Sequence, residues 1–293
     1  MAAASATPDA ALDLRGERQR IAALTREVSI ETSTRNPARI DRYVDLVPPG
    51  TPVYVAHIPG ETHHRLVAIA ARLRIKGFNP VPHVAVRNFI SFTQLQDYLA
   101  RLVGEADVRQ ILAIAGDVPK PAGPYAATIE ALETGMFERL GIRRIGIAGY
   151  PEGASRIGGA DLAKALGDKA AYARRAGLDA YIVTQFCFES APVAAWIART
   201  RAAGIDLPIH VGLAGPATLR TLLKYALRCN IGNSVRALGS RAAAITQVLT
   251  ERGPERVVRG LAAAPEVAGH IAGLHLFPDR KSTRLNSSHG YIL

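Results

Sequence analysis

Acidic side chains follow two of the apolar runs in the sequence. The run at 111–115 ends in Gly116 and Asp117, and the Val-Ser-Ile run at 28–30 ends in Glu31. A short aliphatic run bounded by turn formers predicts a buried strand, and an acid just past it lies where parallel-sheet enzymes keep their catalytic groups. Two carboxylates without a metal-ligand cluster indicate acid–base chemistry or cofactor tuning, and no metal centre.

Each acid also has a purely structural interpretation. A Gly-Asp pair such as Gly116 and Asp117 can simply turn the chain and cap the next helix. Glu31 can be held by a salt bridge in the floor or rim of the fold. If Glu31 instead faces an apolar interior, loss of hydration raises its pKa, so that it can hold a proton near neutral pH.

Eight apolar runs recur along the chain, and helical patterns separate them. We expect strands at 28–31, 52–58, 80–86, 111–117, 144–150, 180–185, 208–213 and 272–277. We expect helices at about 37–47, 61–76, 91–103, 125–140, 161–176, 192–203, 218–227, 234–252 and 254–264. This alternation requires parallel strands with crossover helices. It predicts an α/β fold, a single (β/α)8 TIM barrel over 25–278, with a doubly wound open sheet as the alternative.

In such a barrel the carboxyl ends of the strands meet at one mouth. The polar and aromatic residues at the expected strand ends would then surround a single site. These residues are Glu31, His57, His83, Asp117, Tyr150, Gln185 and either His275 or Phe277.

The two ends of the sequence do not follow the strand and helix pattern. Residues 1–24 are rich in Ala, and we expect a leader and a short helix outside the main fold. Residues 279–293 are polar and aperiodic and resemble translated sequencing-adapter sequence. We expect this tail to be non-native and exclude it from the fold.

The bulk composition argues against a nucleic-acid or membrane protein. The chain of 293 residues is 48% hydrophobic and has a formal charge of +11, but its Lys and Arg residues are spread along the helices. A positive field of this kind can attract anionic small molecules. The sequence lacks an apolar run of membrane length and a secretory signal. With two distant cysteines, Cys187 and Cys229, it predicts a cytoplasmic protein.

The strand-end motifs, taken in order over about 25–278, resemble the methylenetetrahydrofolate reductases. The matching motifs are Val-Ser-Ile-Glu ending at Glu31, Pro-His-Val around His83, Ala-Gly-Asp ending at Asp117, Gly-Tyr-Pro-Glu ending at Glu152, and Thr-Gln-Phe-Cys-Phe around Gln185. The resemblance implies an enzyme that uses FAD to carry a hydride from NAD(P)H to 5,10-methylenetetrahydrofolate, giving the 5-methyl form. It also implies a homo-oligomer that acts in one-carbon metabolism and methionine biosynthesis.

The resemblance assigns roles to individual positions. Glu31 matches the general acid that protonates a folate nitrogen, and Asp117 matches the aspartate near both flavin and pterin. Gln185 matches the amide that binds the pterin, and Phe277 lies near the position of a substrate-facing tyrosine. The positions that match flavin contacts are His83, Gly116, Tyr125, Ala126 and Tyr150, and Lys169 is a possible substitute for a shifted basic residue.

The chain also departs from the family pattern at cofactor positions. Ala115 stands where Arg precedes Gly-Asp, and residues 153–155 replace a histidine. The loop at 32–37 lacks the usual aromatic residues. Two alternatives therefore remain open: a folate-binding paralogue resembling methyltransferases, without a working hydride-donor site, or a non-enzymatic protein that binds flavin or folate.

Overall fold

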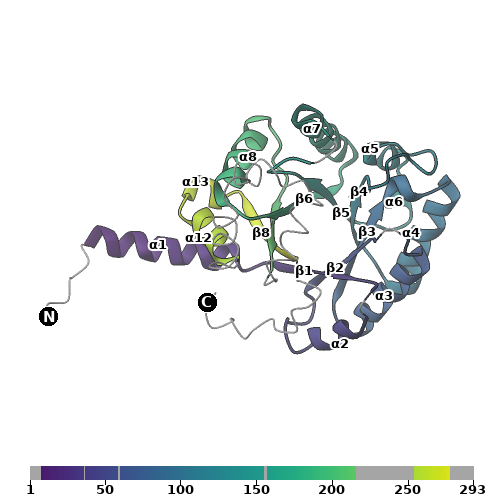
Figure 1. Ribbon diagram of the computed structural model, residues 1–293, viewed down its shortest axis with the longest axis horizontal. Coiled ribbons are helices and arrows are strands. Elements are labelled where there is room, and N and C mark those ends of the chain that lie inside the picture. Colours follow the sequence, from purple (N-terminus) through teal and green to yellow (C-terminus); the bar gives the residue numbers. More distant parts are fainter. Residues whose placement is uncertain (1–7, 36, 59, 155–156, 216–253, 278–293) are drawn as a thin grey trace, which may run out of the picture.

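Eight parallel strands close into a barrel in the computed structural model, which describes residues 8–35, 37–58, 60–154, 157–215 and 254–277 (Figure 1). Each strand pairs with the next, and β8 pairs with β1. The strands are β1 (Val28–Ser33), β2 (Pro52–Ala56), β3 (Asn79–Ala85), β4 (Gln110–Ile114), β5 (Arg144–Gly149), β6 (Asp179–Cys187), β7 (Ile209–Ala214) and β8 (Ile271–Phe277). The predicted (β/α)8 barrel is confirmed.

Helices lie around the outside of the barrel (Figure 1). They include α1 (Pro8–Leu24), α2 (Ile40–Tyr43), α3 (His63–Ile75), α4 (Phe92–Ala106), α5 (Thr128–Leu132), α6 (Met136–Arg139), α7 (Gly159–Ala176), α8 (Ser190–Ala202), α12 (Glu255–Ala262) and α13 (Pro265–Ala268). The predicted cap of α4 is confirmed, since Ser91 Oγ accepts a hydrogen bond from the Gln94 amide at 3.1 Å. The helices expected at 218–227 and 234–252 lie outside the described residues.

Two predicted helices were wrong in extent. The expected helix at 125–140 is divided into α5 and α6, because Gly135 adopts a positive φ of 62° that an α-helix does not accommodate. The expected helix at 37–47 contains only a 3-10 turn and α2, which ends at Tyr43 ahead of Pro48 and Pro49. The periodicity of apolar residues does not detect such local interruptions of a helix.

Helix α1 is longer than the short helix expected from the sequence, and its C-terminal end packs on the barrel. It contacts α12 and β8, and Leu24 is fully buried in the outer core. The Arg20 side chain donates a hydrogen bond to the carbonyl of Ala262. The predicted tail at 279–293 lies outside the described residues.

The side chains inside the barrel form a group separate from the outer core between strands and helices. A small cluster contains Tyr54, Val81, Leu112, Tyr181 and Val183. Paired residues on parallel strands point to the same face of the sheet, and Glu31 pairs with Tyr54 on β2. Glu31 therefore shares the inner face with these residues.

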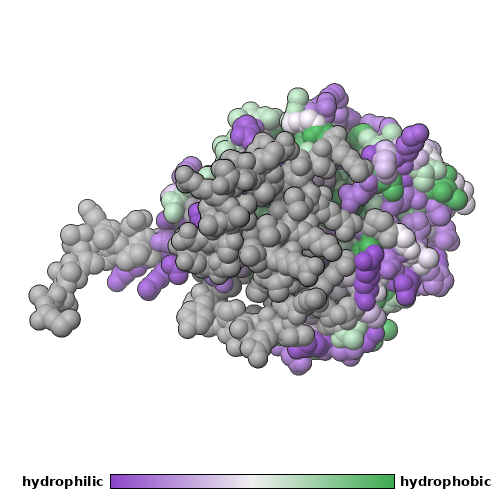
Figure 2. Space-filling view, viewed as in Figure 1, coloured by the Kyte–Doolittle hydropathy of each residue, from purple (hydrophilic) through white to green (hydrophobic). Residues whose placement is uncertain are grey.

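The described surface in Figure 2 is largely hydrophilic, with small hydrophobic areas between hydrophilic ones. Within the described ranges, no helix combines the length and apolar character needed to span a bilayer.

Candidate functional site

Glu31 lies between two histidines inside the barrel. Its Oε2 atom is 3.5 Å from Nε2 of His83 on β3 and 3.8 Å from Nε2 of His275 on β8. The Glu31 side chain is 21% exposed, whereas that of His275 is 1% exposed. The pairing of β8 with β1 brings His275 and Glu31 together, although 243 positions separate them in the sequence (275 − 31 − 1).

Burial sets the protonation states of this group. It raises the pKa of Glu31, an effect that His83 partly opposes. Burial lowers the pKa of His83 to about 4 and that of His275 to about 3. Both imidazoles are therefore neutral at neutral pH, and Glu31 is disposed to keep a proton.

Ser29 contacts Nδ1 of His275, so that the other ring nitrogen, Nε2, faces Glu31. Ser29 Oγ lies 2.9 Å from Nδ1 of His275 and donates to the carbonyl of Leu274 at 3.3 Å. When the serine proton is used in this way, the tautomer that completes the contact has the hydrogen on Nδ1 of His275, which donates to Ser29. Nε2 is then the unprotonated nitrogen, and it has no hydrogen-bond partner among the described residues.

Aromatic rings line the barrel beside His275. The Phe277 ring meets the His275 imidazole edge to face at 4.5 Å, and Phe186 lies 5.5 Å from Phe277. Phe188 continues this series at 5.6 Å from Phe186. These rings provide an apolar wall against which a flat ligand ring can pack.

Asp117 lies on the β3–β4 side of the mouth. It follows Gly116, whose φ of +100° turns the chain directly after β4. The 3-10 helix Val86–Asn88 supports this turn, because the Arg87 amide donates to Ala115 O at 3.0 Å and its guanidinium donates to Pro119 O at 2.9 Å.

His57 joins the Asp117 side of the site. Its ring lies 3.2 Å from Nδ2 of Asn88. Burial lowers the pKa of His57, and the charges of Asp117 and Glu61 partly oppose that shift. Asp117, which follows β4, therefore acts electrostatically on a histidine that follows β2.

Gln185 lies in a β-bulge. Val183 pairs with His210 and Phe186 pairs with Gly212, so that two residues on β6 stand opposite one on β7. A Cβ atom on Gly212 would lie 2.4 Å from the Thr184 carbonyl oxygen. The bulge therefore requires glycine on β7, and it redirects the side chains that follow Val183.

Other predicted positions lie further out. Tyr125 is buried in the outer core, where its hydroxyl has no partner among the described residues. The exposed Ala126 donates its amide hydrogen to Glu130 at 2.7 Å. Tyr150 is half-buried at the end of β5, and Lys169 is half-buried on α7, where burial lowers its pKa. Glu31 thus contacts His83 and His275, and His275 contacts Phe277. The described contacts do not bring Tyr125 or Lys169 into that group.

Several buried polar atoms around the mouth lack a hydrogen-bond partner within the described part of the chain. They are Nε2 of His83, Nε2 of His275, Nε of Arg87 and Oδ1 of Asn88. Leaving such groups unsatisfied costs about 1–3 kcal/mol each. A heterocyclic ligand with its own donors and acceptors is the kind of molecule that they could hold.

The sequence profile of the methylenetetrahydrofolate reductases matches residues 37–235. The chain belongs to the methylenetetrahydrofolate reductase family. A 5,10-methylenetetrahydrofolate reductase of Pectobacterium carotovorum subsp. carotovorum is 30% identical over 202 residues, which is 66% of this chain and 62% of that protein. The alignment therefore covers less than two thirds of the relative.

Two solved structures also resemble the fold. Dihydropteroate synthase from Thermus thermophilus, in complex with 6HMPPP, matches at 13% identity and a TM-score of 0.46, over 85% of this chain and 86% of that one. A D-psicose 3-epimerase in the presence of D-fructose matches at 16% identity and a TM-score of 0.37, over 83% and 99%.

The range matched to the methylenetetrahydrofolate reductase family contains His83, Asp117 and Gln185 but not Glu31 or Phe277. The family match gives a range only and does not test the role of any single residue. The link of Glu31 and Phe277 to the site comes from barrel closure, which places β1 beside β8.

Sequence reasoning missed several residues of this family member's site. Ser29 and Tyr54 were not selected, and His275 remained an alternative to Phe277. The alternation of β1 contained a signal, because Ser29 and Glu31 are two positions apart and share a face. Glu152, the last residue of the Gly-Tyr-Pro-Glu motif, accepts a hydrogen bond from the Phe188 amide at 3.4 Å, and burial raises its pKa to about 6.

Proposed function

We propose that this chain catalyses the flavin-dependent reduction of 5,10-methylenetetrahydrofolate to 5-methyltetrahydrofolate, with NAD(P)H as the hydride donor. The observation that carries the proposal is Glu31, a largely buried carboxyl group between the neutral imidazoles of His83 and His275. Family membership supports the same reaction class.

Glu31 is proposed as the general acid. Its raised pKa keeps the proton on the carboxyl group at a pH where an ordinary glutamate has lost it. The neutral histidines do not supply a full positive charge that would draw the proton off. Protonation of a folate ring nitrogen by Glu31 would open the methylene bridge to the reducible iminium, and this general-acid role is typically worth about 10²–10⁴ in rate.

Asp117 and Gln185 are proposed to orient the substrate. The Gln185 amide can donate and accept at once, which suits the edge of a pterin. The negative charge of Asp117 would act on the pterin and the cofactor from the β4 side. Phe277, within the aromatic wall, would pack against the substrate ring.

The residues at the mouth fit a flavin. The unpartnered atoms of His83, Arg87 and Asn88 offer hydrogen-bonding capacity, and Gly116 leaves the β4 turn without a Cβ that would press on Ala85 at 3.2 Å. We propose that His83, Gly116, Asp117, Tyr125, Ala126 and Tyr150 hold FAD, with Lys169 as a further cation. When bound, FAD supplies reversible hydride transfer between NAD(P)H and the folate.

The positive net charge of the protein favours the binding of anionic ligands. A formal net charge of +11 attracts dinucleotides and polycarboxylates in general. We also propose, from the family resemblance, that the chain forms a homo-oligomer and acts in one-carbon metabolism leading to methionine.

The visible absorption spectrum of the purified protein tests this function. We expect a flavin spectrum that bleaches under anaerobic NADH or NADPH and returns when methylenetetrahydrofolate is added. A protein that stays colourless after reconstitution with FAD would contradict the flavin-dependent reaction.

A second candidate follows from one observation. Ala115 stands where a cationic side chain precedes Gly116 in the family pattern. A folate-binding paralogue without a hydride-donor site would bind the folate but would not bleach with either nicotinamide. Folate binding, measured by calorimetry on the same sample, separates this candidate from an inactive protein.

A further inference from the structure

A chain of hydrogen-bonded side chains runs through the amino-terminal end of the barrel, below Glu31. Nη2 of Arg74 on α3 donates to Oδ1 of Asn79 at 3.1 Å, and Nδ2 of Asn79 donates to Oε1 of Gln110 at 3.1 Å. Nε2 of Gln110 then donates to the Tyr181 hydroxyl at 2.8 Å. The Tyr181 and Tyr54 hydroxyls lie 2.8 Å apart. We refer to these five residues as the floor chain.

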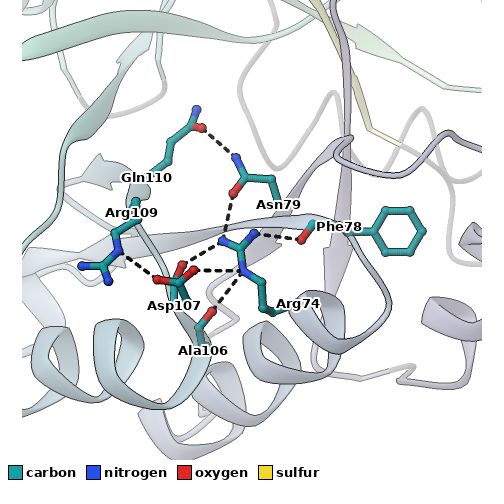
Figure 3. A network of polar contacts seen from close by, with 7 residues as sticks. All are labelled: Arg74, Phe78, Asn79, Ala106, Asp107, Arg109 and Gln110. Atoms are coloured by element: carbon teal, nitrogen blue, oxygen red, sulfur yellow. Dashed lines mark hydrogen bonds and ion pairs between the residues drawn. The ribbon is translucent and has the colours of Figure 1, made fainter.

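The outer end of the floor chain is anchored to the backbone. Figure 3 shows Arg74 between Asn79 and the segment that contains Ala106 and Asp107. Its guanidinium donates to the carbonyls of Phe78 at 3.3 Å, Ala106 at 3.4 Å and Asp107 at 2.8 Å. A planar guanidinium with this many partners has one orientation.

Arg74 gives the floor chain a direction. A guanidinium only donates, so Asn79 must present its oxygen to Arg74 and its NH₂ to Gln110. Gln110 is oriented in the same sense and presents its NH₂ to Tyr181. Tyr181 accepts from Gln110 and shares a further hydrogen bond with the Tyr54 hydroxyl, in which either oxygen can be the donor, and neighbouring bonds in such a chain polarise one another.

Tyr54 ends the floor chain against the imidazoles around Glu31. Its ring centroid is 4.3 Å from that of His275, at a tilt of 55°, and 6.2 Å from that of His83. Tyr54 is also the register partner of Glu31 on the inner face. The ring of His275 is thus held by Ser29 at Nδ1 and by Tyr54 at its face.

We propose that Tyr54 is a positioning residue for Glu31, and that the floor chain holds its ring so that Nε2 of His275 keeps its place beside the carboxyl group. The inference rests on the proposed function, in which Glu31 is the acid. It adds a role for side chains that do not touch the reacting atoms.

The variant Tyr54→Phe tests this role, because it keeps the ring but removes the bond to Tyr181. Tyr181→Phe is the second variant; it removes the same bond from the other side and also removes the acceptor of Gln110. Tyr98→Phe is the matched control, since Tyr98 is equally buried but its hydroxyl has no hydrogen-bond partner in the described part of the chain.

The readout is the infrared carbonyl band of protonated Glu31, titrated with pH and assigned by its loss in Glu31→Gln. A loosened site admits water, so we expect the midpoint to fall by about half a pH unit or more in Tyr54→Phe and Tyr181→Phe. Tyr98→Phe should leave the midpoint unchanged. Equal midpoints in wild type, Tyr54→Phe and Tyr181→Phe would overturn the proposal, as would an equal shift in Tyr98→Phe.

Folate turnover is measured on the same samples, so that the two ideas fail separately. If the wild type shows no folate turnover but the Glu31 band shifts in Tyr54→Phe and Tyr181→Phe, the proposed function is contradicted and the positioning role is supported. If the wild type turns folate over normally but the Glu31 band does not shift in the two variants, the proposed function is supported and the positioning role is contradicted.

Discussion

Ser29 Oγ lies 2.9 Å from Nδ1 of His275, across the seam where β8 closes the barrel against β1. This contact ties the first and last strands together at the level of Glu31. It also orients His275 so that its other nitrogen faces the carboxyl group at 3.8 Å. The proposed acid site therefore depends on barrel closure.

Replacing Glu31 by Gln should separate the two half-reactions. Because the amide cannot donate a proton as an acid, we expect folate reduction to fall by about 10²–10⁴-fold. Flavin reduction by NAD(P)H should change little, and stopped-flow absorbance measures both steps. Glu105→Gln, at an exposed position on α4, is the control, and undiminished folate reduction in Glu31→Gln would remove the acid role.

Replacing Ser29 by Ala should release the His275 ring. Loss of the buried hydrogen bond should lower the free energy of unfolding by about 1–2 kcal/mol, measured with urea, and slow the folate half-reaction. Ser91→Ala removes the N-cap of α4 and should cost about 1 kcal/mol without slowing that reaction. Equal effects of both variants on folate reduction would argue against a special role for Ser29.

The buried histidines predict a loss of stability in acid. The folded-state pKa values of about 4 for His83 and about 3 for His275 lie below the ordinary value of 6.5. The unfolded chain binds more protons in that interval, so their stabilising contribution is full above pH 6.5 and falls as pH decreases toward 4 and 3. Thermal unfolding against pH measures this slope, which should be shallower in His83→Gln.

The raised pKa of Glu31 predicts that its contribution to stability depends on pH in the opposite direction. Its raised folded-state pKa means that its contribution to stability is full below the ordinary value of 4.5 and falls as pH rises through the folded-state pKa. The folate half-reaction needs the protonated acid and should slow over the same upper range. A rate that rises with pH there would contradict the assignment, and Glu31→Gln should show no such dependence.

Because of the bulge on β6, we expect that Gly212 on β7 cannot be replaced by a larger residue without loss of stability. Alanine at Gly212 would place a Cβ 2.4 Å from Thr184 O and 2.8 Å from Gln185 O. We expect Gly212→Ala to lower the free energy of unfolding by about 2–4 kcal/mol and to weaken folate binding through Gln185. Gly167→Ala on α7, where no atom lies within 4 Å, should instead stabilise the protein by about 0.5–1 kcal/mol.

Local pattern was sufficient for the strands and for the barrel. Apolar runs bounded by turn residues predicted all eight strands, because a parallel strand buried on both faces must be nearly continuous in apolar residues. The same pattern correctly placed Asp117 just past β4, whereas Glu31, expected at the end of its strand, lies inside β1, which continues to Ser33. It failed at 125–140, where the backbone conformation of Gly135 interrupts a helix that periodicity alone would continue.

The contacts of the site were decided by tertiary structure. Glu31 and His275 meet only because β1 and β8 pair on closure, and Gln185 lies in a bulge that depends on Gly212 of another strand. The sequence by itself determined which apolar runs form strands and which polar residues lie on or next to them, since that depends on near neighbours in the chain; it did not determine where the strands end, because β1, β3 and β6 continue past Glu31, His83 and Gln185. Which of these residues touch, and which lose enough water to change their pKa, depends on strand register and burial, and those properties exist only in the closed barrel.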